Sequence, residues 1–303
     1  MKLLITGAWR PTEEQLNPIR ELGHEILFMP DERGTMPCSC EDVEGVICNG
    51  LFLYHPIEQF KSLTYIQLTS AGFDRVPMSY ITEKGITIRN ARGVYSIPMA
   101  EFALSEVLTI YKHVDHFRAA EQAHRWDKHR GLRELYGKRV CIVGCGNVGT
   151  ECAKRFAAMG CDLVGVDAYP REDDRYTAML PVGALPQAIS VSDIVILTLP
   201  LTEETRHLIG KEELTLLPEG CVLVNIARGG IVDTEALVEV LRKRQDLTAV
   251  LDVFEEEPLP AESPLWDLPN VTVTPHNSFV GERNSVRLYE LIKENLIDES
   301  RRY

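Results

Sequence analysis

The stretch that decides the fold of this chain is residues 139–167, which read RVCIVGCGNVGTECAKRFAAMGCDLVGVD. The segment predicts a strand, a glycine-rich turn, a helix from about Asn147 and a second strand. Gly144 permits the tight turn, Gly146 lets the backbone approach a pyrophosphate, and Gly149 lets the helix pack closely on the strand. This order of elements is typical of a dinucleotide-binding unit.

An acid stands at the end of the second predicted strand. There the carboxylate of Asp167 would accept hydrogen bonds from a ribose 2′-hydroxyl and repel a 2′-phosphate. The helix from Asn147 would offer unpaired N–H groups and the positive end of its dipole to the phosphates. The predicted cofactor is therefore NAD rather than NADP.

Length and charge narrow the class of protein. The chain has 303 residues, enough for two domains, with 45% hydrophobic residues and a net charge of −13. Both nucleic acid and anionic membranes demand clustered Lys and Arg, so neither is an expected partner. No apolar run approaches the ~20 residues that span a bilayer, and the start of the chain reads as a strand rather than a signal peptide. We therefore expect a cytoplasmic protein.

The eight cysteines are scattered through apolar segments, as reduced thiols in a core would be. Only Cys38 and Cys40 lie close together in the sequence. No second Cys or His pair follows at a zinc-binding spacing, so no metal site is expected.

Apolar runs alternate with helical stretches from Gly137 onward, which predicts a parallel sheet covered on both faces. We expect six strands, which make a full Rossmann sheet. The expected strands are Val140–Val143, Leu163–Asp167, Asp193–Leu199, Cys221–Ile226, Thr248–Val253 and Val271–Thr274.

The residues before this sheet predict a second, smaller α/β unit of the flavodoxin-like kind, with a helix over Thr12–Leu22. A C-terminal helix over Glu282–Asp298 would return to pack on it. The expected strands of this unit are Lys2–Thr6, Glu25–Met29, Gly45–Cys48, Tyr65–Thr69 and Thr87–Arg89.

The fold class is therefore α/β with two Rossmann-like or flavodoxin-like domains. Residues 1–96 with 281–303 would form the substrate domain, and residues 97–280 the NAD-binding Rossmann domain inserted in it. Two connections would make a hinge around a cleft between the domains. A long apolar helix from Ile97 to about Ala123 would join them or take part in a subunit interface.

Three candidate catalytic residues follow different predicted strands of the Rossmann sheet: Arg228, Glu257 and His276. Ligands of such sheets bind beyond the carboxyl ends of the strands, so the three side chains are expected at one edge. His276 would exchange a proton with a hydroxyl, while Glu257 would orient the imidazole and favour its protonated form. Arg228 would polarise a carbonyl and bind a neighbouring carboxylate. These groups suit hydride transfer at a carbon that bears oxygen.

Each residue also has a plain structural interpretation. Arg228 could be a solvated loop charge, Glu257 part of an exposed acidic run that starts at Glu255, and His276 a loop histidine with structural hydrogen bonds. Their common placement at one edge favours the catalytic interpretation.

The motifs around these residues resemble the D-isomer-specific 2-hydroxyacid dehydrogenases over nearly the whole chain. The matching motifs are GCGNVG at 144–149, LPLTEET at 199–205, NIARGG at 225–230, DVFEEEP at 252–258, TPH at 274–276, SAGFD at 70–74 and Ala100-Glu101. The resemblance implies NAD-dependent reduction of small 2-keto acids to D-2-hydroxy acids, and the reverse reaction. It also implies a homodimer built through the cofactor domains, with the helix after Ile97 at the interface.

The resemblance further implies which residues bind the ligands. The backbone N–H groups of Ala71 and Gly72 would bind the substrate carboxylate. The cofactor would be lined by Asn147, Val148, Leu199, Thr205, Ile226, Ala227, Asp252 and His276, beside the glycines and Asp167.

The chain departs from the family pattern in two places. After His276 it reads Asn-Ser-Phe, where the family commonly has Ile or Val followed by small, glycine-rich residues. The end at Tyr303 leaves less chain to complete the substrate domain.

Substrate choice should depend on the loop after Gly45–Cys48, whose residues Leu51–Tyr54 are unusually apolar. We expect Leu51 to contact a small 2-keto acid with a modest apolar or short polar tail, although the same residues could pack the domain interior. Trp9 and Arg10 are further candidates for this pocket.

Other functions remain open on this scaffold. One is an NAD(H)-sensing binding protein or corepressor, and another is a dehydrogenase of a different small donor, such as formate or phosphite. Turnover of 2-keto acids separates these functions from the main prediction.

Overall fold

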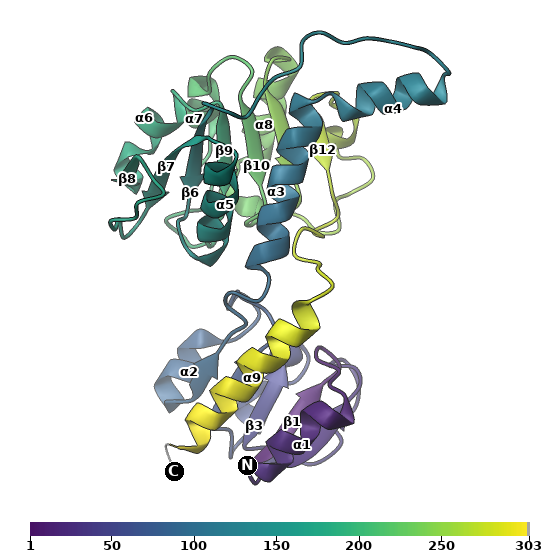
Figure 1. Ribbon diagram of the computed structural model, residues 1–303. Helices are drawn as coiled ribbons and strands as arrows, with labels where there is room; N and C mark the ends of the chain where they lie inside the picture. The colour runs from purple at the N-terminus through teal and green to yellow at the C-terminus, as the bar shows by residue number, and fades with distance from the viewer. Residues whose placement is uncertain (302–303) are drawn as a thin grey trace. The chain divides into compact units, whose positions relative to one another are not determined.

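The computed structural model describes residues 1–301. The chain divides into two compact units, Met1–Tyr95 together with the segment from Gly281, and Ser96–Val280 (Figure 1). Each unit is built on its own parallel sheet, of five and seven strands respectively. The prediction of two α/β units with parallel sheets is confirmed.

The unit Ser96–Val280 holds the larger sheet, with strand order β12-β11-β10-β9-β6-β7-β8. Alternate residues of its central strands enter two separate apolar cores, one on each face of the sheet. This explains why these strands read as continuous apolar runs. The strands are β6 Arg139–Val143, β7 Asp162–Asp167, β8 Ala178–Pro181, β9 Ile194–Leu197, β10 Val222–Asn225, β11 Thr248–Leu251 and β12 Val271–Val273.

The prediction of six strands was one strand short. The strand missed is β8, which pairs with β7 at the edge of the sheet and is only partly buried. It is only four residues long and ends in a proline, and none of its residues is fully buried.

Helices cover both faces of this sheet. The first of them after β6 is α5, Asn147–Ala158, which buries Gly149, Cys152, Ala153 and Phe156. Asp233 caps the start of α8 by accepting a hydrogen bond from the Ala236 N–H. The remaining helices of this part are α6 Leu185–Ile189, α7 Lys211–Leu216 and α8 Thr234–Lys243.

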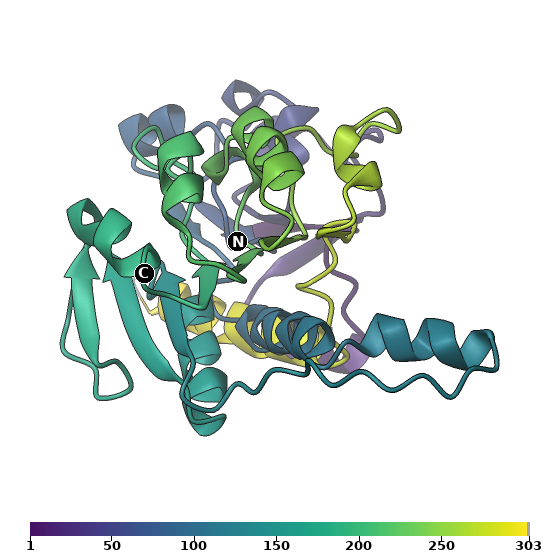
Figure 2. The same ribbon diagram turned by 90° about the horizontal axis from the view of Figure 1, so that it is seen from above.

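The long helix predicted from Ile97 to Ala123 is wrong in its length. The structure has two helices, α3 Ser96–Tyr111 and α4 Val114–Gln122. They are separated at His113, whose φ is +49°. A residue in the left-handed region cannot continue a right-handed helix. Figures 1 and 2 show α4 and the segment after it standing out from the sheet of this unit.

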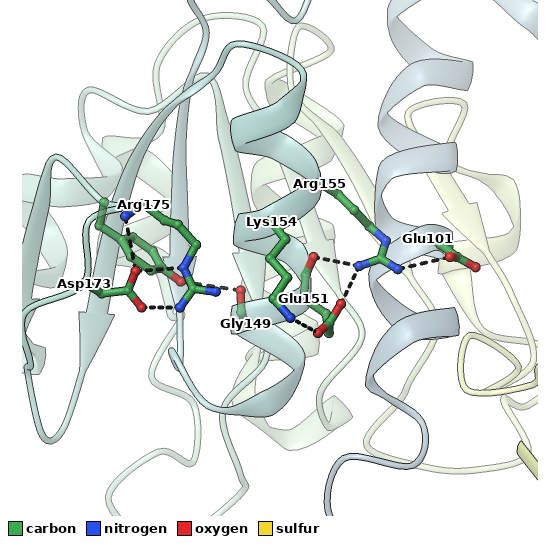
Figure 3. A network of polar contacts seen from close by, with 8 residues as sticks. Glu101, Gly149, Glu151, Lys154, Arg155, Asp173 and Arg175 are labelled. Carbon is green, nitrogen blue, oxygen red and sulfur yellow. Dashed lines mark hydrogen bonds and ion pairs between the residues drawn. The ribbon is translucent and has the colours of Figure 1, made fainter. Parts of the chain in front are cut away.

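Helix α3 packs along α5 in the same unit. It contributes Ala100, Ala103, Val107 and Tyr111 to the core that α5 also enters. Arg155 of α5 pairs with Glu151 at 2.7 Å and with Glu101 of α3 at 3.0 Å (Figure 3). This ion-pair network fixes α3 beside the helix that begins at the glycine turn.

The unit that begins at Met1 has strand order β2-β1-β3-β4-β5. The C-terminal helix α9 buries Leu288, Ile292 and Leu296 in a core that Leu3 and Ile5 of β1 also enter. The elements of this unit are β1 Lys2–Thr6, α1 Glu13–Glu21, β2 Glu25–Met29, β3 Gly45–Cys48, β4 Tyr65–Leu68, α2 Met78–Lys84, β5 Thr87–Arg89 and α9 Asn284–Ser300.

Short 3-10 helices lie at Cys40–Asp42, Leu51–Leu53, Ile57–Gln59, Val182–Ala184, Gly229–Ile231 and Pro264–Asp267. Among residues 1–301, no helix is both long and apolar enough to cross a membrane.

Candidate active site

The glycine turn has the geometry that a dinucleotide requires. A side chain on Gly144, whose φ is +93°, would come within 2.6 Å of the Leu199 backbone nitrogen, and one on Gly149 within 2.2 Å of the Gly144 carbonyl oxygen. Nothing lies within 4 Å of the corresponding position on Gly146, which caps the 12-residue helix α5. Two glycines therefore permit close packing, and the third leaves the helix N-terminus open to a phosphate. These residues fit a dinucleotide.

Asp167 lies against this turn at the end of β7. Its Oδ2 accepts a hydrogen bond from the Cys145 N–H at 2.7 Å, and its Oδ1 accepts one from the Tyr169 N–H at 2.9 Å. Burial raises the pKa of Cys145 to about 11, so this thiol stays protonated and serves packing in the turn. Asp167 is thus fixed beside the turn, as the fingerprint predicts.

The loop after β10 presents Arg228. The fully buried Asn225 accepts a hydrogen bond from the Ala227 N–H at 3.1 Å and donates one to the Arg228 carbonyl at 3.0 Å. A side chain on Gly229 would lie 1.8 Å from the carbonyl carbon of Phe254, so this loop packs on the loop after β11. Our sequence interpretation missed Asn225, whose signal is a lone amide that ends an otherwise apolar strand.

Glu257 and His276 are in direct contact. The Nδ1 atom of His276 lies 2.7 Å from Oε2 of Glu257, and the Phe254 N–H donates to Oε1 of Glu257 at 3.0 Å. Both carboxylate oxygens of Glu257 are therefore engaged. Within residues 1–301, Nε2 of His276 makes no hydrogen bond, which leaves this nitrogen for a substrate.

The backbone at His276 is held in the left-handed region, with φ +50°. Asp252, which is fully buried, accepts hydrogen bonds from Thr274 Oγ1 at 2.7 Å, the Asn277 N–H at 2.8 Å and the Ser278 N–H at 2.9 Å. The contact of Asp252 with the cofactor stays a prediction, and the structure adds that both of its carboxylate oxygens are bonded to this loop. Asp252 thereby fixes the residues on both sides of His276.

The other residues predicted to line the cofactor differ in what they expose. The side chains of Leu199, Ile226 and Ala227 are buried in the apolar cores, which favours contact with a ligand through their backbones. Thr205 Oγ1 accepts from the Thr202 N–H at 2.7 Å and donates to the Pro200 carbonyl at 2.7 Å, which shapes its own loop. Asn147 and Val148 form the first turn of α5.

In the unit that begins at Met1, Ala71 and Gly72 follow the end of β4. The Asn90 side chain donates to the Ala71 carbonyl at 2.6 Å, and Ser70 Oγ donates to the Gly72 carbonyl at 3.1 Å. In the part of the chain that the structure describes, the N–H groups of Ala71 and Gly72 make no hydrogen bond. These two donors are therefore available to an anion.

Two candidates for the substrate pocket are buried in this unit. Leu51 is 0% exposed in the core of its own unit, which favours the alternative that its side chain packs the domain interior. Trp9 is likewise buried, whereas Arg10 is exposed. Leu53 and Tyr54, from the same loop as Leu51, are 60% and 53% exposed. The apolar pattern of this loop could not distinguish core residues from surface ones.

The acidic run also contains a second contact that our sequence interpretation missed. Oε1 of Glu255 lies 2.6 Å from Nε2 of His207, and Oε2 accepts a hydrogen bond from the Thr234 N–H at 3.2 Å. His207 also has a positive φ, +52°. Neither Glu255 nor Glu257 is the free surface charge that an acidic tripeptide usually indicates.

Comparison with known proteins identifies the family. Residues 104–278 match the family model described as D-isomer specific 2-hydroxyacid dehydrogenase, NAD binding domain. D-3-phosphoglycerate dehydrogenase of Methanocaldococcus jannaschii is 37% identical over 223 residues, which cover 73% of this chain and 42% of that protein. Glyoxylate reductase of Thermofilum pendens is 31% identical over 282 residues, which cover 90% of this chain and 83% of that protein.

A solved structure resembles the whole chain. It is a D-isomer specific 2-hydroxyacid dehydrogenase from Xanthobacter autotrophicus Py2 in complex with NADPH and MES, with 29% identity and a TM-score of 0.80. The match covers 98% of this chain and 93% of that one. The chain therefore belongs to the D-isomer specific 2-hydroxyacid dehydrogenase family, whose members are oxidoreductases that act on CH–OH groups with NAD(P).

Proposed function

We propose that this protein reduces small 2-keto acids to D-2-hydroxy acids with NADH, and catalyses the reverse reaction, with His276 as general acid and base. The observation that carries the proposal is the 2.7 Å contact between Nδ1 of His276 and Oε2 of Glu257 at the carboxyl edge of the sheet. A carboxylate on one ring nitrogen orients the imidazole, so that the other nitrogen can donate a proton.

Each residue of the site has its own role in the proposed reaction. When bound, NADH supplies the hydride. His276 gives a proton from Nε2 to the carbonyl oxygen of the keto acid, and takes it back in the oxidative direction. Arg228 polarises that carbonyl and pairs with the neighbouring carboxylate, which suits a planar guanidinium. The free N–H groups of Ala71 and Gly72 support a further role in binding the carboxylate.

NADH is the proposed cofactor because Asp167 stands at the ribose position of the fingerprint. Gly146, Asn147 and Val148 form the helix start that would bind the pyrophosphate. Asp167 would accept hydrogen bonds from the ribose hydroxyls and disfavour a 2′-phosphate.

The proposed substrate is a small 2-keto acid with a modest apolar or short polar tail. With Leu51 in the core, the exposed Leu53 and Tyr54 are the residues of this loop that support contact with the tail. The similar proteins named above include a reductase of glyoxylate and a dehydrogenase of 3-phosphoglycerate, so the substrate panel must contain both classes.

We further propose a homodimer with α3 and α4 at the interface. The segment of α4 and the residues after it exposes Phe117, Trp126 and Leu132, with Trp126 92% exposed. Such apolar side chains on a projecting segment favour burial against a second copy. The proposed location is the cytoplasm, where buried thiols such as Cys141 and Cys221 stay reduced.

The test is a panel of 2-keto acids with NADH, followed by absorbance. Pyruvate, glyoxylate, hydroxypyruvate, branched 2-keto acids and 3-phosphohydroxypyruvate should be compared by kcat/KM. We expect turnover of small unphosphorylated acids and a D-configured product. Tight NADH binding without turnover would point to a sensor protein, and activity only with formate or phosphite and NAD would point to a different donor.

A further inference from the structure

Glu32, on the loop between β2 and β3, accepts three hydrogen bonds through its carboxylate. Its Oε1 accepts from Thr6 Oγ1 at 2.7 Å and from the Asn49 N–H at 2.7 Å, and its Oε2 accepts from the Gly50 N–H at 2.7 Å. Thr6 is the last residue of β1, and Asn49 and Gly50 directly follow β3. One charged group therefore joins the loop after β2 to the carboxyl ends of β1 and β3.

The loop after β3 is attached to its surroundings at three points. Glu32 binds the first two backbone N–H groups of the loop, Leu51 is fully buried in the core, and Nε2 of His55 lies 3.0 Å from the Glu32 carbonyl oxygen. The exposed side chains of Leu53 and Tyr54 lie between the last two of these points. Glu32 provides two of the three attachments, so the positions of these side chains depend on it.

This loop begins beside the N–H groups that are proposed to bind the substrate carboxylate. The Thr69 N–H donates to the Cys48 carbonyl at 2.9 Å, which joins the ends of β3 and β4, and Ala71 and Gly72 follow β4. An open cavity of about 310 Å³ is lined by residues from both loops, Leu53 among them. A keto acid whose carboxylate binds after β4 can therefore meet the loop after β3 with its tail.

A second glutamate joins the same two strands at their opposite end. Glu44 directly precedes β3, and its Oε2 accepts a hydrogen bond at 2.5 Å from the N–H of Lys2, the first residue of β1. Ligands of parallel sheets bind beyond the carboxyl ends of the strands, so Glu44 lies at the edge away from the proposed site. The two glutamates make comparable links between β1 and β3, and only Glu32 also holds the loop.

We propose that Glu32 is a positioning residue for substrate selectivity, because it holds Leu53 and Tyr54 where they contact the tail of the 2-keto acid. Glu32 acts through the backbone of Asn49 and Gly50 and does not itself touch the substrate. The inference rests on the proposed function and adds the residue on which the choice among 2-keto acids depends.

The first test is the kinetics of Glu32→Gln, whose amide cannot accept from all three donors. For keto acids that carry a tail, such as pyruvate and hydroxypyruvate, kcat/KM should fall by roughly 10-fold, which is within the range that one contact in a pocket contributes to discrimination. The loss should appear in KM, with kcat within about threefold, because contacts with the tail are the same in substrate and transition state. NADH affinity should be unchanged.

Glyoxylate is the internal control, because it carries only hydrogen on its keto carbon and has no tail for the loop to contact. Its kcat/KM should change by less than about threefold in Glu32→Gln, since no tail contact is lost. Glu32→Asp should retain part of the selectivity, because it keeps the charge on a shorter side chain. Glu44→Gln is the matched control variant and should leave the ratio of the two classes of substrate unchanged.

The second test needs no substrate. Amide hydrogen exchange, followed by mass spectrometry, should be roughly 10-fold faster in Glu32→Gln for the peptide that holds Asn49 and Gly50, because each loses a hydrogen bond to a charged group. Glu44→Gln should leave exchange in this peptide unchanged.

The outcomes separate the two proposals. Equal losses of kcat/KM for glyoxylate and for acids with a tail would overturn the role of Glu32, since that is the pattern of a general packing defect. Unchanged exchange in the loop, the same change of selectivity in Glu44→Gln, or turnover of glyoxylate alone by the wild-type protein would also overturn it. These four results leave the proposed function standing. If the wild-type protein turns over no 2-keto acid, the proposed function itself is refuted, and the selectivity role with it.

Discussion

The chain contains two His–Glu pairs that look alike and are oriented differently. His276 meets Glu257 at 2.7 Å and His207 meets Glu255 at 2.6 Å, and both histidines have a φ near +50°. His276 uses Nδ1 for its glutamate, whereas His207 uses Nε2. The two rings are therefore oriented differently. His276 leaves Nε2 for a substrate, whereas Nε2 of His207 contacts Glu255.

The loops around the two pairs differ as well. A buried carboxylate, Asp252, fixes the residues on both sides of His276. Glu255 instead joins His207 to the start of α8 through the Thr234 N–H. The first arrangement positions a reactive nitrogen, and the second ties two loops together. Four predictions test this difference.

The largest effect is expected from His276→Asn, which removes the proton donor at a backbone position that Asn tolerates. In the proposed reaction kcat should fall by about 10²–10⁴-fold, the range for losing general acid catalysis, while NADH affinity is spared. Steady-state kinetics and NADH titration measure the two quantities.

His207→Asn is the matched control, since it makes the same change at the same kind of backbone position. It should reduce kcat by less than about tenfold, or about 1.4 kcal/mol. Equal losses in the two variants, or a large loss of NADH binding in His276→Asn, would contradict the assignment of the proton donor.

The next effect is expected from Glu257→Gln, which keeps the shape of the side chain and removes its charge. A hydrogen bond to a charged group is worth about 1.5–3 kcal/mol, so kcat/KM should fall by roughly 10- to 100-fold. Steady-state kinetics measures this fall. An unchanged kcat/KM would show that Glu257 does not act through His276, and Glu255→Gln is the matched control that should leave kcat/KM unchanged.

A smaller effect is expected from Asp252→Asn, because an amide cannot accept from all three donors of the His276 loop. An unsatisfied buried donor costs about 1–3 kcal/mol, which corresponds to an unfolding midpoint lower by roughly 2–10 °C. Differential scanning calorimetry measures this shift. A variant as stable as the wild type, with normal kcat, would show that the loop does not depend on Asp252.

The smallest effect is a pH dependence of stability at Glu255. Burial acts to raise the pKa of this carboxyl, but the hydrogen bonds from Thr234 and His207 outweigh burial and hold the pKa below its ordinary value of 4.5. Such a group stabilises the folded state above the unfolded pKa, and the stabilisation is lost as the pH falls through the folded pKa.

The difference in unfolding midpoint between the wild type and Glu255→Gln should therefore be constant from pH 7 to about pH 5 and shrink below about pH 4.5. Thermal unfolding followed by circular dichroism measures it. A difference that grows toward low pH would have the wrong sign and would show that the Glu255 carboxylate does not cause the pH dependence.

Most of the fold followed from local patterns. Central strands such as β9 are apolar on both sides, so their existence and type could be predicted without knowing what covers them. The edge strand β8 and the break at His113 were missed because neither has a local signal: one is short and half-exposed, and the other has an unusual backbone angle at a non-glycine residue.

The candidate site was predictable in its residue types and only partly in its contacts. Arg228, Glu257 and His276 follow strands whose carboxyl ends must meet at one edge, so their common placement could be inferred from order alone. The roles of Asp252 and Asn225 could not, because a buried polar residue is defined by the donors around it, and these come from loops distant in the sequence.

By itself the sequence determined a glycine turn between β6 and α5, an acid at the end of β7 and two α/β units, because these depend on periodicity and on backbone limits within short segments. Only the tertiary structure decided that Leu51 is buried, that Glu255 and Glu257 bind different histidines, and that Arg171 bonds to the Cys145 carbonyl while Arg175 pairs with Asp173. Burial and charge pairing are properties of neighbours in space, and residues adjacent in the sequence can have entirely different neighbours.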